Sequence, residues 1–350
     1  MHIQMLKLEA EKIIAKKESH GYREYRIPGI VWHQGKIFLA YEARAEETGD
    51  WGDIDVVVLR LSPDGELQQV LKIGQSHLPK DGAMRTYNNP TLIPDGDRVH
   101  LIYHQNYERA FMVTSQNQGN TWSAPREITQ TYRDFPFPWN VCATGPGHGL
   151  QMQNGRLIAP IWLANGKMRD NGTREHMPSV SGCIFSDDHG KTWHAGAMTK
   201  GITDANETCA ALLADGRLLF NIRNRNEKMR RMLALSSDGG ETFDRIWTAE
   251  DLVDPRCFGG MDADAQGNIF FANCHCENAR TNLTLQTTDN AGENWRIMQE
   301  IDPKGGYADL SLQQGNLSIF YERYSPQRRI VDELVLKIFQ PQEALPESTK

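Results

Sequence analysis

The most regular feature of the chain is a pair of short apolar runs separated by a tight turn. In the first pair, GIVW at residues 29–32 is followed by a turn at Gly35 and then by KIFLAY at residues 36–41. Apolar runs of this length, bounded by turn residues, are typical of β-strands. Similar pairs lie at residues 29–41, 90–103, 150–158, 210–220, 261–271 and 310–320. The pattern predicts six β-hairpins and indicates no long helix.

A second repeat, with the pattern S-x-D-x-G-x-T-W, lies between these hairpins and predicts a turn of fixed shape. Its copies are SDDHGKTW at 186–193, SQNQGNTW at 115–122, SSDGGETF at 236–243, TDNAGENW at 288–295 and a shorter SPDGE at 62–66. The Asp side chain can bond turn amides, Gly can take a positive φ, and the last aromatic residue can pack between neighbouring units. Asn117 and Asn290 replace the Asp in two copies, and Asn can form the same bonds.

Six hairpins with boxes recurring about every 50 residues predict an all-β fold, a six-bladed β-propeller with four strands in each blade. Length alone would permit two domains, but a regular repeat favours one domain over residues 1–350. Residues 1–20 form a segment of uncertain structure. This segment carries Lys and Glu throughout, without the apolar centre of a signal peptide, and no apolar run is long enough to span a bilayer. We therefore expect a cytoplasmic protein without a membrane partner, although a protein trimmed of its leader would look the same.

Composition narrows the choice of partners and cofactors. The formal charge is −7 and no basic run stands out, which argues against a nucleic-acid partner. The six cysteines, at 142, 183, 209, 257, 274 and 276, show no paired framework, so a reducing compartment is the simpler interpretation. Cys274-His275-Cys276 could suggest a metal site, but no second ligand pair stands at zinc spacing. We expect neither a metal nor another cofactor.

One insert, residues 131–149, is dense in Pro, Gly and aromatic residues. Its GPGHG segment at 145–149 could suggest a phosphate-binding loop. No Gly-Lys-Ser/Thr follows it, however, and the next element is a predicted strand rather than a helix. A loop on the working face of the propeller is the expectation.

The YRIP motif at residues 25–28, together with the repeated boxes, resembles the exo-α-sialidase (neuraminidase) superfamily, bacterial type, over almost the whole chain. The resemblance implies a six-bladed propeller with three arginines around its axis. It also implies an aspartate that acts as acid and base, and a tyrosine nucleophile paired with a glutamate.

The three arginines that match the family pattern are Arg26, Arg223 and Arg280. Arg26 belongs to the Arg-Ile-Pro motif, Arg223 follows the implied glutamate by one hairpin, and Arg280 stands shortly before the last box. Rigid, always charged guanidinium groups bind a planar carboxylate well. Arg225 competes with Arg223, although the order of residues after Glu207 favours Arg223.

Asp50 resembles the acid/base, which in the family lies in a loop after the first hairpin. Asp53 and Asp55 are the alternatives: Asp55 opens the next apolar run and Asp53 belongs to its turn, whereas Asp50 stands further out. Arg44, just before this loop, could add a contact to the sugar hydroxyls.

Tyr307 resembles the nucleophile and Glu207 its base. The anomeric carbon of a sialoside bears a carboxylate, which repels an anionic nucleophile but not a neutral phenol. The family carries Tyr-Ser-Asp-Leu here, whereas this chain has Tyr-Ala-Asp-Leu, and the change leaves the phenol in place. The alternative is a core tyrosine in a first strand. The preceding Gly305 and Gly306 weigh against it, because they favour an exposed side chain.

The resemblance implies a retaining exo-glycosidase that hydrolyses terminal α-linked sialic acid from glycans. Alternatives are a hydrolase or trans-glycosylase for a related 2-keto sugar acid such as Kdn or Kdo, and a non-catalytic carbohydrate-binding propeller. The joint presence of Tyr307, Glu207 and Asp50 speaks against the last. The expected partner is a sialylated glycan or a related glycoside. The sequence says nothing of linkage preference or oligomeric state.

Overall fold

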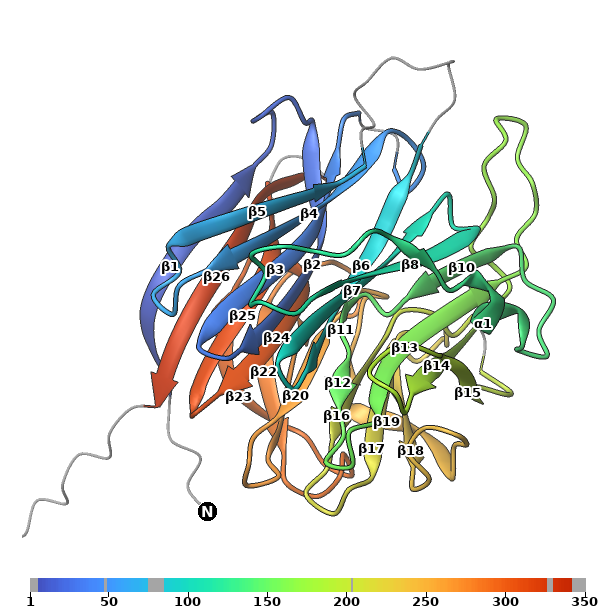
Figure 1. Cartoon of the computed structure of the whole chain (residues 1–350). Coiled ribbons are helices and arrows are strands. Elements are labelled where there is room, and N and C mark those ends of the chain that lie inside the picture. Colours follow the sequence, from blue (N-terminus) through green and yellow to red (C-terminus); the bar gives the residue numbers. More distant parts are fainter. Residues whose placement is uncertain (1–5, 47–48, 75–84, 203, 326–329, 342–350) are drawn as a thin grey trace, which may run out of the picture.

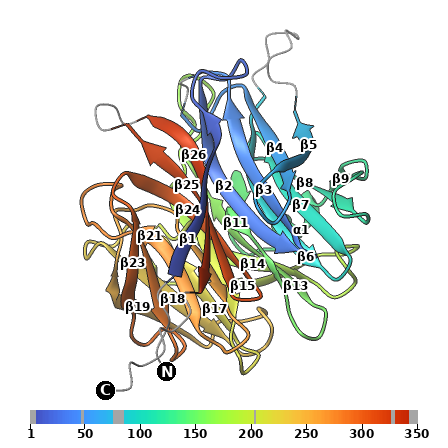
Figure 2. The same cartoon turned by 90° about the vertical axis from the view of Figure 1, so that its left-hand side faces the viewer.

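The computed structural model describes residues 6–46, 49–74, 85–202, 204–325 and 330–341. Within them, six sheets stand around a common axis (Figure 1, Figure 2), which confirms the predicted six-bladed β-propeller. The helix α1 (Thr129–Arg133) has five residues. No helix in these ranges has the length and apolar character needed to cross a membrane.

From the axis outward, the first sheet contains β2 (Glu24–His33), β3 (Lys36–Arg44), β4 (Ile54–Leu61) and β5 (Leu67–Ile73), and the other sheets follow in the same order. The second contains β11 (Gly147–His148), β6 (Tyr87–Asp95), β7 (Arg98–Gln105), β8 (Arg109–Ser115) and β9 (Arg126–Glu127). The third contains β10 (Val141–Thr144), β13 (Leu157–Ala164), β14 (Ser179–Ser186) and β15 (His194–Met198), with β12 (Leu150–Gln151) also paired to β13.

The other three sheets each have four antiparallel strands. The fourth contains β16 (Thr208–Leu212), β17 (Leu218–Ile222), β18 (Arg230–Ser236) and β19 (Arg245–Val253). The fifth contains β20 (Gly260–Ala263), β21 (Ile269–Cys274), β22 (Leu283–Thr288) and β23 (Arg296–Asp302). The sixth contains β24 (Gly305–Gln313), β25 (Asn316–Tyr324), β26 (Val331–Pro341) and β1 (Leu6–Lys16).

The ring is closed by the segment whose structure the sequence left open. β1 pairs antiparallel with β26, so the start and the end of the chain share the sixth sheet. Glu and Lys alternate with apolar residues along β1, as suits an outermost strand with one open edge. Residues 1–5 of the predicted N-terminal segment lie outside the described residues. Next to this sheet, apolar side chains of β3 such as Ile37 and Leu39 share a core with Phe320 and Leu336.

Each box forms the turn that leads into the outermost strand of its blade, with the local bonding that the sequence predicts. In the copy after β14, the Asp188 carboxylate accepts the Thr192 amide (2.8 Å) and the Thr192 hydroxyl (2.7 Å), and Gly190 has a φ of 73°. Trp193 is buried in a core shared with Met112 of β8, so the box aromatic joins two blades. Asn117 contacts the same two groups of its own turn: its Oδ1 accepts the Thr121 amide, and its Nδ2 donates to the Thr121 hydroxyl.

The prediction of a loop at residues 131–149 is wrong in part. The segment contains most of α1, and then β10 and β11. β10 pairs with the C-terminal half of β13, while β11 lies parallel to β6 at Thr91 and Leu92. This insert therefore supplies inner strands to two blades. The sequence did not reveal these strands because each has only two to four residues and lies in a segment rich in Pro and Gly.

Candidate active site

The candidate residues lie at one end of the propeller because of the way the strands alternate. In a four-stranded antiparallel blade, the start of the first strand and the connection between the second and third strands share one face. Tyr307 lies at the start of β24, and Glu207 stands directly before β16. Arg223 and Arg280 belong to connections between second and third strands. The boxes, each of which leads into the outermost strand of its blade, lie at the opposite face.

Tyr307 and Glu207 form a buried hydrogen-bonded pair. The Tyr307 hydroxyl lies 3.0 Å from Glu207 Oε1 and 2.8 Å from Oε2, although the two residues are 100 positions apart. Burial raises the pKa of Tyr307 well above its ordinary value, and the opposing effect of the Arg223 charge does not cancel this rise. The phenol is therefore neutral in the free protein and donates a hydrogen bond to the Glu207 carboxylate.

Tyr307 is only 5% exposed, so the expectation drawn from its flanking glycines is wrong. A Cβ on Gly306 would lie 2.1 Å from the Tyr324 ring, and one on Gly305 would lie 2.4 Å from Leu283 Cβ. The glycines are required because neighbouring side chains pack against the backbone there. The tyrosine lies in a first strand, as its alternative interpretation expected, and it also faces the site.

Arg26 is fixed by a carboxylate that the sequence analysis did not identify. Its Nε and Nη2 atoms donate to Glu322 Oε1 (3.0 Å) and Oε2 (3.1 Å), and the Ile27 amide also donates to Oε1 (3.0 Å). Glu322 is fully buried and also accepts a bond from the Tyr324 hydroxyl (2.9 Å). Ile27 has a φ of 61°, at a register shift between β2 and β3. This kink and the carboxylate together set the direction of Arg26.

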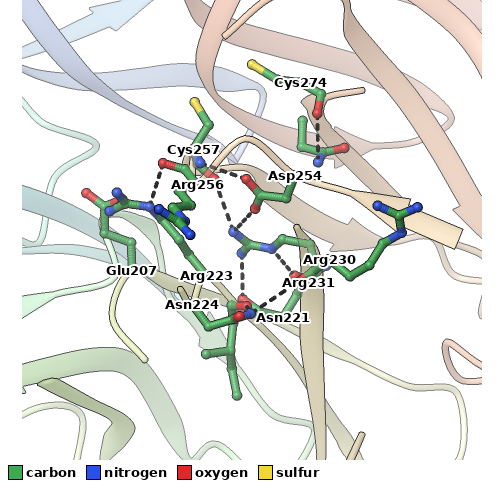
Figure 3. Close-up of polar contacts among 12 residues, drawn as sticks. Glu207, Asn221, Arg223, Asn224, Arg230, Arg231, Asp254, Arg256, Cys257 and Cys274 are labelled. Atoms are coloured by element: carbon green, nitrogen blue, oxygen red, sulfur yellow. Dashed lines mark hydrogen bonds and ion pairs between the residues drawn. The ribbon is translucent and has the colours of Figure 1, made fainter. Parts of the chain in front are cut away.

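Arg223 and Arg280 meet at one backbone carbonyl. The Nε atom of Arg223 donates to the carbonyl of Arg256 at 2.8 Å (Figure 3). The Nη2 atom of Arg280 lies 3.4 Å from the same oxygen. Arg223 also donates from Nη1 to Glu207 Oε2 (2.7 Å). The guanidinium of Arg280 lies 4.9 Å from the centre of the Tyr307 ring, and that of Arg26 lies 5.1 Å from it. The structure thus brings the three predicted arginines around one tyrosine.

Asp50 lies beside Arg44, with its side chain half exposed at 49%. Arg44 donates to Asp50 Oδ1 (3.3 Å) and to the Gly49 carbonyl (2.6 Å), while its Nε (3.0 Å) and Nη2 (2.6 Å) bind Glu42, which is fully buried. Burial alone would raise the pKa of Asp50, but the positive charges of Arg44, His176 and Arg26 hold it well below its ordinary value. Arg44 therefore holds Gly49 and Asp50 in place.

The alternatives left open by the sequence have other positions. Asp55 is fully buried at the start of β4 and accepts the Tyr22 hydroxyl (2.6 Å), and Asp53 accepts the Arg85 amide (3.3 Å). Arg225 is exposed, whereas the Arg223 side chain is 13% exposed and bound to Glu207. The sulfur of Cys274 contacts the Gly305 carbonyl (3.4 Å), and all six cysteines are free. Among the described residues, no group of His, Cys, Asp and Glu is arranged to hold a metal ion.

Comparison with known proteins identifies the family of the chain. The profile of the BNR repeat-like domain family matches residues 35–319. A sialidase of Micromonospora viridifaciens is 27% identical over 90% of this chain and 52% of its own length, and sialidase-3 of Bos taurus is 31% identical over 66% of this chain and 59% of its own length. The chain thus spans little more than half of these curated relatives.

Solved structures share the fold. The Hadza microbial sialidase Hz136 superposes with a TM-score of 0.77 at 21% identity, over 94% of this chain and 68% of that one. The intramolecular trans-sialidase of Ruminococcus gnavus, in complex with oseltamivir carboxylate, has a TM-score of 0.71 at 16% identity, over 94% and 96%. The family profile, which spans most of the chain, shows that the chain belongs to the BNR repeat-like domain family, and its sialidase relatives support the bacterial-type exo-α-sialidase superfamily.

Proposed function

We propose that this protein is a retaining exo-glycosidase that removes terminal α-linked sialic acid and uses Tyr307 as its nucleophile. The observation that carries the proposal is the bond between the Tyr307 hydroxyl and Glu207, at 2.8 Å to Oε2. Two guanidinium groups, of Arg26 and Arg280, lie over the tyrosine ring, and a third, of Arg223, binds the glutamate. A buried tyrosine bonded to a carboxylate can be an ordinary structural pair. Three arginines gathered around it instead favour an anionic substrate at that point.

The arginines bind the substrate carboxylate in this proposal. Arg26, Arg223 and Arg280 come from three different blades, so they can approach one carboxylate from three sides. Each guanidinium offers donors in a planar fork that matches a carboxylate. With the carboxylate held there, the anomeric carbon that bears it lies next to the Tyr307 oxygen.

In the first step the Tyr307 oxygen attacks the anomeric carbon and Glu207 accepts the phenolic proton. The bond to the leaving glycan oxygen breaks, and Asp50 supplies the proton that this oxygen needs. In the second step Asp50 takes a proton from water and the water oxygen attacks the anomeric carbon. The bond between this carbon and the Tyr307 oxygen breaks, and Glu207 returns its proton to that oxygen. Two displacements retain the anomeric configuration.

The low pKa of Asp50 in the free protein requires an explanation, because an acid must hold a proton. Positive charge, Arg26 included, keeps the pKa of this carboxyl low against the effect of burial. A substrate carboxylate bound to Arg26 cancels part of that charge, which raises the pKa of Asp50. In this proposal the substrate itself prepares the acid.

The test is cleavage of 4-methylumbelliferyl sialoside, followed by trapping with a 3-fluorosialosyl fluoride. We expect the label on Tyr307 by peptide mass, and we expect Tyr307→Phe to fold normally but to lose at least about 1,000-fold in kcat, roughly 4 kcal/mol of barrier. Tyr103→Phe is the control, because Tyr103 is a buried tyrosine of β7. A label on another residue, or near-normal turnover by the Phe variant, would contradict the proposal.

The same assay distinguishes the related activities. Parallel glycosides of Kdn and Kdo report which 2-keto acid is preferred, and added lactose reports transfer, because a trans-glycosylase makes sialyllactose where a hydrolase releases free acid. Binding of sialic acid without cleavage of any of these glycosides would instead support a carbohydrate-binding propeller.

A further inference from the structure

The three arginines proposed to bind the substrate carboxylate, Arg26, Arg223 and Arg280, form a carboxylate clamp. A buried ion pair lies near this clamp, outside the residues that would touch the substrate. Arg231 of β18 is fully buried, and its Nη1 atom donates to Asp254 Oδ2 at 2.8 Å. Its Nε and Nη2 atoms donate to the side-chain and backbone oxygens of Asn221, at 2.6 and 3.0 Å. The guanidinium also lies 5.5 Å from the centre of the Phe271 ring. Enclosed in this way, Arg231 has no route to a bound sugar.

Arg231 holds both ends of the 254–257 segment, which is part of the short connection between β19 and β20. The Nη1 atom that binds Asp254 also donates to the carbonyl of Cys257 at 3.1 Å. The other oxygen of Asp254 accepts the Cys257 amide at 2.7 Å. One nitrogen and one carboxylate therefore fix both ends of four residues (Figure 3).

Between these two fixed ends lies the carbonyl of Arg256, which accepts bonds from Arg223 and Arg280. Arg256 has a φ of 60°, a left-handed conformation that costs energy for a residue with a side chain. Such a conformation persists only where the surroundings impose it. Loss of the bonds at either end would let the segment relax, and the carbonyl would turn away from the two arginines.

We propose that Arg231 and Asp254 are positioning residues for the carboxylate clamp. They hold the Arg256 carbonyl, and this carbonyl sets the directions of Arg223 and Arg280. A shared acceptor also keeps two like charges close together, which would otherwise separate. The inference rests on the proposed function, because it assumes that these arginines bind the substrate carboxylate.

The test uses variants that differ in how they treat the buried charge. Asp254→Asn removes the charge of one partner and keeps the shape. A double variant with Arg231→Met and Asp254→Leu removes both charges, and replacing a buried pair by apolar residues is often neutral for stability. Asp187→Asn is the control, because it breaks an Arg–Asp pair, with Arg156, in a box at the opposite face. Circular dichroism and thermal melting establish which variants fold.

We expect the folded double variant to raise KM for 4-methylumbelliferyl sialoside about tenfold, with kcat within about threefold, since carboxylate binding contributes to ground state and transition state alike. Competition supplies the decisive readout. The ratio of the inhibition constants of sialic acid methyl ester and free sialic acid should fall about tenfold, because only the free acid uses the clamp. Asp254→Asn should likewise raise KM and lower this ratio, whereas Asp187→Asn should leave both unchanged.

A folded double variant with KM and the ester ratio within twofold of the wild type would overturn the inference, whether or not its melting temperature falls. Such a result leaves the proposed function standing, since the wild type still cleaves the substrate. A wild-type protein that neither cleaves sialosides nor binds sialic acid would overturn the proposed function, and the inference with it.

Discussion

Glu322→Gln tests whether Arg26 depends on a buried negative charge. Glu322 is fully buried and binds two nitrogens of Arg26, at 3.0 and 3.1 Å, while the Arg26 side chain is 13% exposed. Glutamine keeps the size of the side chain but removes its charge. It also places an N–H group where a carboxylate oxygen of Glu322 accepts hydrogen bonds. The variant would leave a nearly buried guanidinium without its counter-ion.

The cost of that change can be estimated from the burial of the pair. Breaking a buried ion pair by removing one partner costs about 3–5 kcal/mol. Unfolding entropy of about 2.1 cal/mol/K per residue gives roughly 0.7 kcal/mol/K for a chain of this length, so the melting temperature should fall by about 4–7 °C. Scanning calorimetry measures this shift. Added sialic acid should recover part of the loss, because its carboxylate replaces the missing charge at Arg26.

Tyr324→Phe is the matched control. It removes one hydrogen bond to Glu322 and leaves both charges, so it should cost only about 1 kcal/mol. If Glu322→Gln melted within 1 °C of the wild type, or no lower than Tyr324→Phe, Arg26 would not depend on this charge. The account of how Arg26 is positioned would then be wrong.

Four further predictions concern other residues of the site and of the fold. Asp50→Ala should reduce cleavage of natural sialosides far more than of aryl sialosides, measured by kcat/KM on both, because a good leaving group needs little protonation. Arg280→Lys should lower kcat/KM by about 1–3 kcal/mol, and a change under twofold would refute its role. Burial alone would lower the pKa of His148, but the Asp309 charge raises it to about 9; this pair should therefore stabilise the fold fully below pH 6.5 and lose its effect as pH rises toward 9, seen as a fall in melting temperature that His148→Gln abolishes. Asp188→Ala should cost about 1–2 kcal/mol in urea unfolding, with kcat/KM unchanged because its box lies at the opposite face.

The local signals in the sequence were sufficient for the blades and for most of the candidate site. Hairpins and boxes are short-range features, and their chemistry is complete within about eight residues, as the bonds of Asp188 to Thr192 show. The resemblance then placed Tyr307, Glu207 and three arginines in order along the chain. Because each blade repeats the same strand directions, residues at equivalent places in different blades reach the same face.

The partners of those residues could not be predicted, because they come from distant parts of the chain. Glu322 is 296 positions from Arg26, and nothing near either residue marks the pairing. β1 was left open because a strand with alternating charges becomes evident only when β26 is placed beside it. The role of the Arg256 carbonyl belongs to backbone geometry, and a side-chain pattern contains no sign of it.

The balance of charge around Tyr307 gives a physical reason for an acidic substrate. The three arginines of the site that have a carboxylate partner are Arg26 with Glu322, Arg44 with Glu42, and Arg223 with Glu207. Asp50 also lies against Arg44, whereas among the contacts of the described residues Arg280 meets only the Arg256 carbonyl and the Tyr307 ring, so its charge has no carboxylate partner. A carboxylate nucleophile in place of Tyr307 would pair with Arg280 and cancel that charge before the substrate arrived. A neutral phenol leaves it available, so in the proposed function the tyrosine nucleophile and the anionic sugar follow from the same arrangement.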